Sequence, residues 1–184
     1  MGFLTGEPLA LDLINTRAHT PSGVIDALDT AESFESWLAE QGDRLAPLSS
    51  PPTAADLAAV RVLRRHVAEA VEQVRQGARP SPDAVEALNR AVRAAPPYPV
   101  ATWDGARLIA DIRRDGDERD RLLARLAEAA VELLTDPDVV KVRGCEGPHC
   151  TMRFLPAHPR RRWCSPALCG NRVRVARYHQ RHNG

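Results

Sequence analysis

Residues 145–150 read Cys-Glu-Gly-Pro-His-Cys, and residues 164–169 read Cys-Ser-Pro-Ala-Leu-Cys. These two segments hold all four cysteines of the 184-residue chain, in two pairs of identical CxxxxC spacing. Two such pairs can place four thiolates around one zinc ion in a tetrahedral arrangement. A segment this short cannot build its own hydrophobic core, so bound metal would stabilise it. We therefore predict one structural zinc ion, with four ligands: Cys145, Cys150, Cys164 and Cys169.

The same cysteines could instead form two disulfides or be four unrelated buried thiols. A cytosolic location would disfavour disulfides, and random placement would not gather every cysteine within residues 145–169. Four thiolates also saturate zinc and leave no position for an activated water, which argues against metal-dependent catalysis. The histidines of this region fit exposed polar residues better than ligands; they are His149, His158, His179 and His182.

Charge is distributed unevenly along the chain. The whole sequence carries 25 Lys+Arg and 24 Asp+Glu, for a formal net charge of +1. Residues 1–140 hold 15 basic and 23 acidic residues, a balance of −8, whereas residues 141–184 hold 10 basic residues against Glu146 alone, a balance of +9. This asymmetry predicts that the C-terminal end binds a polyanion.

The segments around the cysteines predict a small finger. Val139 to Arg143 resembles a strand that enters the first cysteine pair, and Met152 to Leu155 resembles a returning strand. A helix is expected from Ser165 or Pro166 to about His182, and it would carry the last ligand. Strand, cysteine pair, return strand and helix follow one another in the order of a treble-clef-like finger.

Arginines gather beside and within this predicted helix. A triplet precedes the third cysteine, a row lies at positions i, i+3 and i+7 on one side of the helix, and Asn171 and Arg172 lie near its start. Guanidinium groups fork onto phosphate oxygens, and Asn and Arg also read base edges. A solvated helix face with salt bridges to the acidic body is the alternative. The predicted nucleic-acid contacts are Arg160, Arg161, Arg162, Asn171, Arg172, Arg174, Arg177 and Arg181.

Residues 1–138 show the pattern of a mainly helical domain. Helices are predicted to begin near four residues, Asp29, Thr53, Ser81 and Asp117. In the helix after Ser81, the buried side is expected to hold Val85, Leu88 and Val92. Asp104-Gly105 predicts the tight type I′ turn of a hairpin over residues 100–112. The run from Leu9 to Thr16 fits a strand or a helix equally well.

The predicted fold is mainly α (α+β): a multihelical domain with one β-hairpin at residues 1–138, and a zinc finger at residues 139–184. No stretch approaches the roughly 18 to 20 consecutive apolar residues that cross a bilayer. Glu7 and Asp12 interrupt the apolar residues near the N-terminus, so no secretory signal is expected. We therefore expect a soluble, cytoplasmic protein.

Three stretches resemble known families. Arg161-Arg162-Trp163-Cys164-Ser165, followed by Cys169-Gly170-Asn171-Arg172, strongly resembles the CGNR zinc finger, which takes its name from that tetrapeptide. Pro8-Leu9-Ala10-Leu11-Asp12-Leu13-Ile14-Asn15-Thr16 resembles the Leu-Asp-Phe-Val-Asn-Thr signature of the N-terminal helical domain called ABATE. Arg61 with Leu63-Arg64 resembles the Leu-Arg-rich helix of the same domain. The likeness spans nearly the whole chain.

The resemblance implies a bacterial, stress-linked transcription regulator whose zinc is held by the four cysteines. The sequence departs from the family pattern at Pro166, where Met is common, and at Arg174, where Lys is common. Phe154-Leu155-Pro156-Ala157-His158 also replaces an expected Phe-Tyr-Asp-x-Ser stretch. All four predicted ligands are retained despite these changes.

The leading hypothesis is a zinc-dependent DNA-binding transcription regulator whose helical domain senses a ligand or partner, with a homodimer needed for sequence specificity. The alternative is a zinc-finger protein–protein interaction module without direct DNA binding. An enzyme is disfavoured, because the sequence shows no nucleophile–base pair and no Gly-rich phosphate loop. Three polar residues could line a small-molecule pocket, although helix capping and local hydrogen bonds explain them as well; they are Asp12, Asn15 and Arg17.

Overall fold

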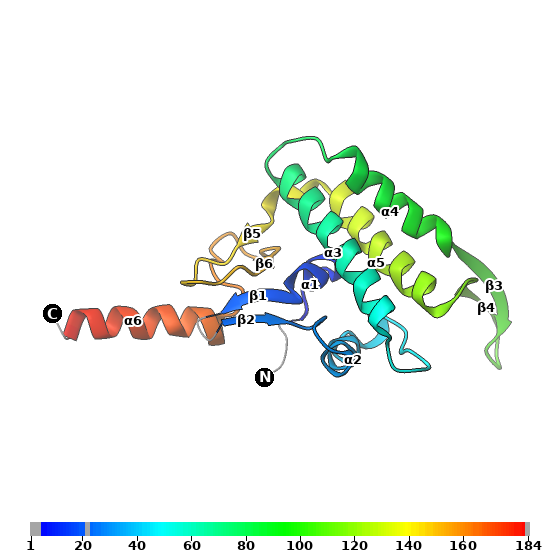
Figure 1. Cartoon of the computed structure of the whole chain (residues 1–184), viewed down its shortest axis with the longest axis horizontal. Coiled ribbons are helices and arrows are strands. Elements are labelled where there is room, and N and C mark those ends of the chain that lie inside the picture. The colour runs from blue at the N-terminus through cyan, green and yellow to red at the C-terminus, as the bar shows by residue number, and fades with distance from the viewer. Residues whose placement is uncertain (1–4, 21–22, 183–184) are drawn as a thin grey trace.

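The structure is a computed structural model that describes residues 5–20 and 23–182. Within these residues, a helical body carries a small finger at one side, and a last helix extends outward from the finger (Figure 1). The α-helices are α1 (Leu9–Asn15), α2 (Ala31–Glu40), α3 (Ala54–Arg75), α4 (Pro82–Ala94), α5 (Glu118–Thr135) and α6 (Asn171–His182). The strands are β1 (Arg17–Thr20), β2 (Gly23–Asp26), β3 (Pro97–Trp103), β4 (Leu108–Arg114), β5 (Arg143–Gly144) and β6 (Arg153–Phe154).

Helices α3, α4 and α5 pack against one another, and the short α1 packs across α3 and α5 (Figure 1). The apolar side of α3 is buried, with Val60 and Val67 fully covered. On α5, Leu126 is fully buried and Leu133 is 5% exposed. Leu11 and Leu13 of α1 close the same core. The ambiguous run after Pro8 is thus a helix, because both of its apolar faces find cover inside the body.

Short-range capping signals set most helix ends. Thr53 and Asp56 form a capping box at the predicted start of α3, and the Ser81 side chain caps α4, which starts at Pro82. The prediction at Asp29 is wrong by one residue, because Thr30 and Ser33 form the capping box of α2. A Thr hydroxyl oxygen that accepts a hydrogen bond from the backbone N–H three residues later satisfies one of the otherwise unpaired donors at a helix start.

In the part of the chain that the structure describes, the strands form three two-stranded antiparallel sheets. The β3–β4 hairpin confirms the predicted one, but its tight turn is centred on Gly105 and Ala106, since Asp104 N–H donates to Arg107 C=O at 3.1 Å. Of the two central residues only Gly105 has a positive φ, +101°, so the type I′ prediction, which needs a positive φ at both, is wrong. The β1–β2 hairpin was not predicted; it pairs Arg17 with Asp26.

Two further local predictions are wrong. Val85 is 41% exposed, because α4 turns Ala84 and Leu88 toward the core. Residues 139–141 belong to a 3₁₀ helix (Pro137–Lys141), and the strand begins only at Arg143. Val139 there is 4% exposed and extends the core of the helical body. Within the described residues, none of the helices is long and apolar enough to cross a membrane.

Candidate metal centre and the helix that follows it

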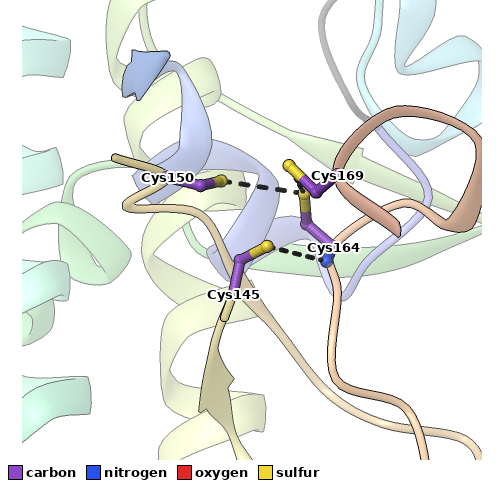
Figure 2. Close-up of side chains that lie close together, drawn as sticks. All are labelled: Cys145, Cys150, Cys164 and Cys169. Carbon is purple, nitrogen blue, oxygen red and sulfur yellow. Dashed lines mark hydrogen bonds between the residues drawn. The ribbon is translucent and has the colours of Figure 1, made fainter. Parts of the chain in front are cut away.

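The four cysteines come from three separate turns and converge on one point (Figure 2). Cys145 directly follows β5, and Cys150 closes the turn before β6. Cys164 lies in the loop after β6, and Cys169 lies in a π-helical turn (Pro166–Gly170) that leads into α6. The short β5–β6 pairing, Arg143 with Phe154 and Gly144 with Arg153, closes the turn that carries Cys145 and Cys150.

The spacing of the sulfur atoms fits one zinc ion. All four Sγ atoms lie within 4.8 Å of one another. The Sγ atom of Cys164 lies 3.8 Å from that of Cys150 and 3.6 Å from that of Cys169. A tetrahedron with Zn–S bonds of about 2.3 Å has S···S edges of about 3.8 Å. The cluster therefore has the donor chemistry and the dimensions of a zinc site with four sulfur ligands.

Backbone groups support the cluster. The N–H groups of Gly147 and Cys164 point at the Sγ atom of Cys145, at 3.4 and 3.3 Å. Such donors offset part of the negative charge on a thiolate. A Cβ atom at Gly147 would lie 3.1 Å from the Sγ atom of Cys169, so this position accepts no larger side chain without displacement. His149 adopts φ of 60°, which completes the tight turn between Cys145 and Cys150.

Electrostatic coupling between the thiols is strong. Hydrogen bonds from Cys150 and Cys164 lower the pKa of Cys145 to about 2. The hydrogen bond to Cys145 raises the pKa of Cys150 to about 12, and it also raises the pKa of Cys164. One thiolate is therefore stabilised by its neighbours, whereas four would repel one another. A divalent cation is the partner that allows all four to be deprotonated together.

Two contacts that sequence patterns did not indicate fix the finger to the helical body. The side chain of Asn15 pairs with the backbone of Arg153 through two hydrogen bonds of 2.8 Å, one donated by Nδ2 and one accepted by Oδ1. Glu7 accepts a hydrogen bond from the backbone of Leu155 at 3.0 Å and forms an ion pair with Arg161 at 2.5 Å. These residues are distant in the sequence, so no spacing signal could have revealed the pairs.

The three predicted pocket residues occupy different environments. Asp12 is fully buried; burial raises its pKa although it forms a 2.6 Å ion pair with Arg44 and accepts from the N–H groups of Gly6 and Glu7. Asn15 is 4% exposed and bonds the backbone of the finger. Arg17 is exposed at the start of β1. Asp12 and Asn15 thus direct their polar atoms to partners inside the protein.

The predicted nucleic-acid residues also separate into groups. Asn171 and Arg174 are exposed on α6, and Arg160 is exposed in the loop before the third cysteine. Arg161 is turned inward, where it donates to Glu7 and to the Cys164 carbonyl and lies 4.4 Å from the centre of the Phe154 ring. Arg162 is exposed and paired with Glu146. Arg172 buries one guanidinium nitrogen. Arg177 and Arg181 also lie on α6, and their side chains lie outside the described part of the chain.

Comparison with known families accounts for nearly the whole chain. Residues 7–137 match the ABATE family, whose description is "Putative stress-induced transcription regulator". Residues 141–182 match the CGNR zinc finger. No curated protein sequence matches the chain significantly. Both matching families are of regulator or zinc-finger type and neither is an enzyme family. With its helical body, and with four cysteines close enough together to hold one zinc ion, the chain belongs to the ABATE family and carries a CGNR zinc finger.

Proposed function

We propose that this protein is a zinc-dependent DNA-binding regulator in which residues 139–184 contact DNA and residues 1–138 sense a ligand or partner. The observation that carries this proposal is helix α6. It starts two residues after Cys169, so a zinc ion on the four cysteines fixes its origin. The helix extends away from the body (Figure 1), and its twelve residues contain four arginines and no acidic residue.

The exposed part of this basic surface fits phosphate contacts. Arg160 and Arg174 are exposed, and no carboxylate among the described residues lies within ion-pair distance of either side chain. Guanidinium groups that are not already paired gain the most from phosphate oxygens and from release of condensed counterions. Arg161 is not part of this proposal, because its guanidinium already holds the finger to the body.

A salt-titrated duplex-binding measurement on the zinc-loaded, full-length chain tests the proposal. The logarithm of the binding constant should fall linearly with the logarithm of salt, by about 0.9 per phosphate neutralised. Arg174→Ala should weaken binding to all sequences and reduce the slope by about 1. Arg90→Ala, at an exposed position of α4, is the matched control and should bind like the wild type. A zinc-loaded chain that binds no duplex at low salt would refute DNA binding.

A second function is favoured by two apolar side chains on the same helix. Val175 is 45% exposed and Tyr178 is 55% exposed. Exposed apolar residues on a projecting helix also suit contact with another polypeptide. Under this alternative, the zinc-loaded chain binds no duplex, and Val175→Ser abolishes association with a protein partner whereas Arg174→Ala leaves that association unchanged. The two variants therefore separate protein binding from DNA binding.

A further inference from the structure

Residues of α3, the start of β1 and the turn before β6 together line a groove. Its volume is about 530 Å³, which is within the size range of small-molecule sites. Three arginines come from one side of α3, a fourth opens β1, and the finger supplies Thr151 and a fifth arginine. These arginines are Arg17, Arg61, Arg64, Arg65 and Arg153. We call this site the arginine groove.

Two of the five guanidinium groups have close carboxylate partners. Arg64 binds Asp26 through two parallel hydrogen bonds, of 2.6 and 2.7 Å, which leaves little excess charge at its end of the groove. Arg153 lies 3.3 Å from Glu72, but Glu72 also binds Arg75 at 2.5 Å and so only partly offsets the charge of Arg153.

The other three arginines are less well compensated. Arg61 donates to the Leu28 carbonyl, and its nearest carboxylate, Asp29, is 3.9 Å away and exposed. Across the described residues, no carboxylate lies within ion-pair distance of Arg17 or of Arg65, and both side chains are exposed. Arg17 lies opposite Asp26 in the β1–β2 pair, but that carboxylate is already bound by Arg64. The arginine groove therefore carries about two uncompensated positive charges.

The remaining lining is suited to an organic ligand. Ile14, Ala68 and Val71 form an apolar part of the wall, and Val71 is buried. The hydroxyl of Thr151 accepts a hydrogen bond from the His19 N–H at 3.0 Å and can still donate its own proton. An apolar wall beside the guanidinium groups of Arg17 and Arg65 is complementary to a small molecule with an apolar portion and an end that carries two negative charges. It matches a duplex less well, because the backbone of a duplex presents phosphates and sugars only.

We propose that the arginine groove binds a small organic phosphate, specifically a phosphomonoester with an apolar substituent. A phosphomonoester carries close to two negative charges at neutral pH and offers three acceptor oxygens, which two forked guanidinium groups and a hydroxyl can engage. This inference rests on the proposed function, because it names the chemical class of the ligand that the helical body senses. The ligand would contact both Arg65 of the body and Thr151 of the finger, and so would join the two units.

The test is calorimetric titration of the zinc-loaded, full-length chain with phenyl phosphate at constant ionic strength. Binding should be saturable with one site per chain, and inorganic phosphate should bind more weakly because it lacks the apolar portion. Arg65→Gln and Arg17→Gln should each weaken phenyl phosphate binding by about tenfold, the loss expected for one charge-assisted hydrogen bond. Arg90→Gln removes the same charge from an exposed position on α4 and should bind like the wild type.

Three outcomes would overturn the inference. The first is a lack of saturable phenyl phosphate binding, and the second is that Arg90→Gln weakens this binding as much as Arg65→Gln does. The third is that the chain binds no phosphomonoester while Arg65→Gln loses duplex binding, which would make the groove part of a DNA surface. Unchanged thermal unfolding of the variants confirms that each one folds. Duplex binding by the same samples, compared with that of Arg174→Ala, tests the proposed function separately. If the groove binds no phosphomonoester, the DNA-binding proposal is still decided by the duplex measurement alone.

Discussion

The helical body buries a continuous cluster of apolar side chains from Leu9 to Val142, including Phe34 and Trp37. In the finger, the described side chains of residues 143–182 that are buried are Met152, Phe154 and Cys169 alone. The body can therefore fold through burial of apolar surface, at about 25 cal/mol per Å². The finger depends on four sulfur ligands and on a few polar contacts with the body. From this difference we expect the body to stay folded without metal and the finger to need it.

Removing zinc is expected to have the largest effect, and it should be confined to the finger. Structural zinc contributes roughly 10–16 kcal/mol to the folding of isolated fingers at neutral pH. After chelation, hydrogen exchange in residues 143–182 should accelerate, whereas α3 and α5 should keep their protection. Readdition of zinc should restore the slow exchange. Unchanged exchange in the finger after chelation would show that zinc is not what stabilises it.

A cavity in the body should have the next largest effect. Trp37 is 1% exposed and stacks near Phe34, with ring centroids 5.9 Å apart. Trp37→Ala should reduce the free energy of unfolding by about 3–5 kcal/mol, because burial is lost and a void remains. Urea denaturation of the full chain measures this change in the free energy of unfolding.

The control for that cavity is Trp103→Ala, since Trp103 is 63% exposed on the β3–β4 hairpin. It should shift stability by no more than about 0.5 kcal/mol. If the two tryptophan variants were equally stable, the core described for the body would be wrong.

Loosening the contact between the two units should have a smaller effect. Asn15→Ala removes both hydrogen bonds to the backbone of Arg153 and leaves that N–H without its partner. We expect the free energy of unfolding to fall by about 1–3 kcal/mol, and hydrogen exchange to accelerate more at residues 152–155 than at α5. Asn89→Ala changes an exposed residue of α4 and should have no such effect. Equal exchange in both variants would mean that Asn15 does not hold the finger.

The smallest expected effect concerns the acid stability of the body. Burial, the largest single influence, would raise the pKa of Asp26, but the hydrogen bonds from Arg64 and from the Leu28 N–H, together with the positive charges of Arg64 and Arg17, hold the pKa below the usual 3.8. The pair therefore stabilises the fold above pH 3.8, and this stabilisation is lost as pH falls through the lower pKa of the folded state. Asp26→Asn should flatten the fall in unfolding free energy below pH 3.8. An unchanged pH profile would assign acid unfolding to other carboxylates.

Local signals predicted much of the body. Thr53 with Asp56, and Ser81 before Pro82, mark helix starts through bonds that span only three residues, so the sequence displays them directly. The β1–β2 hairpin was missed because three of the four residues of β2 are exposed and no apolar alternation marks it. Val139 was misassigned to a strand because its partner is the core of the body, which local spacing does not reveal.

The metal centre was more predictable than its surroundings. The spacing of the cysteines predicted that the four sulfur atoms form one cluster, and they lie together in the structure. Contacts across the two units were not predictable, since the pair of Asn15 and Arg153 joins residues 138 positions apart. For the same reason Arg161, predicted as a phosphate contact, instead bonds Glu7. The position of a basic residue in a motif does not indicate which carboxylate will lie next to it in the folded chain.

The zinc content of the reduced, full-length protein, measured by elemental analysis on the sample used for duplex binding, tests the four-cysteine centre most directly. We expect about one zinc per chain, no measurable zinc in a chain with Cys145→Ser and Cys164→Ser together, and duplex binding that disappears with the metal. Substantially less than one zinc per reduced wild-type chain, or full zinc retention in the double variant, would contradict the centre on which the finger and its helix depend.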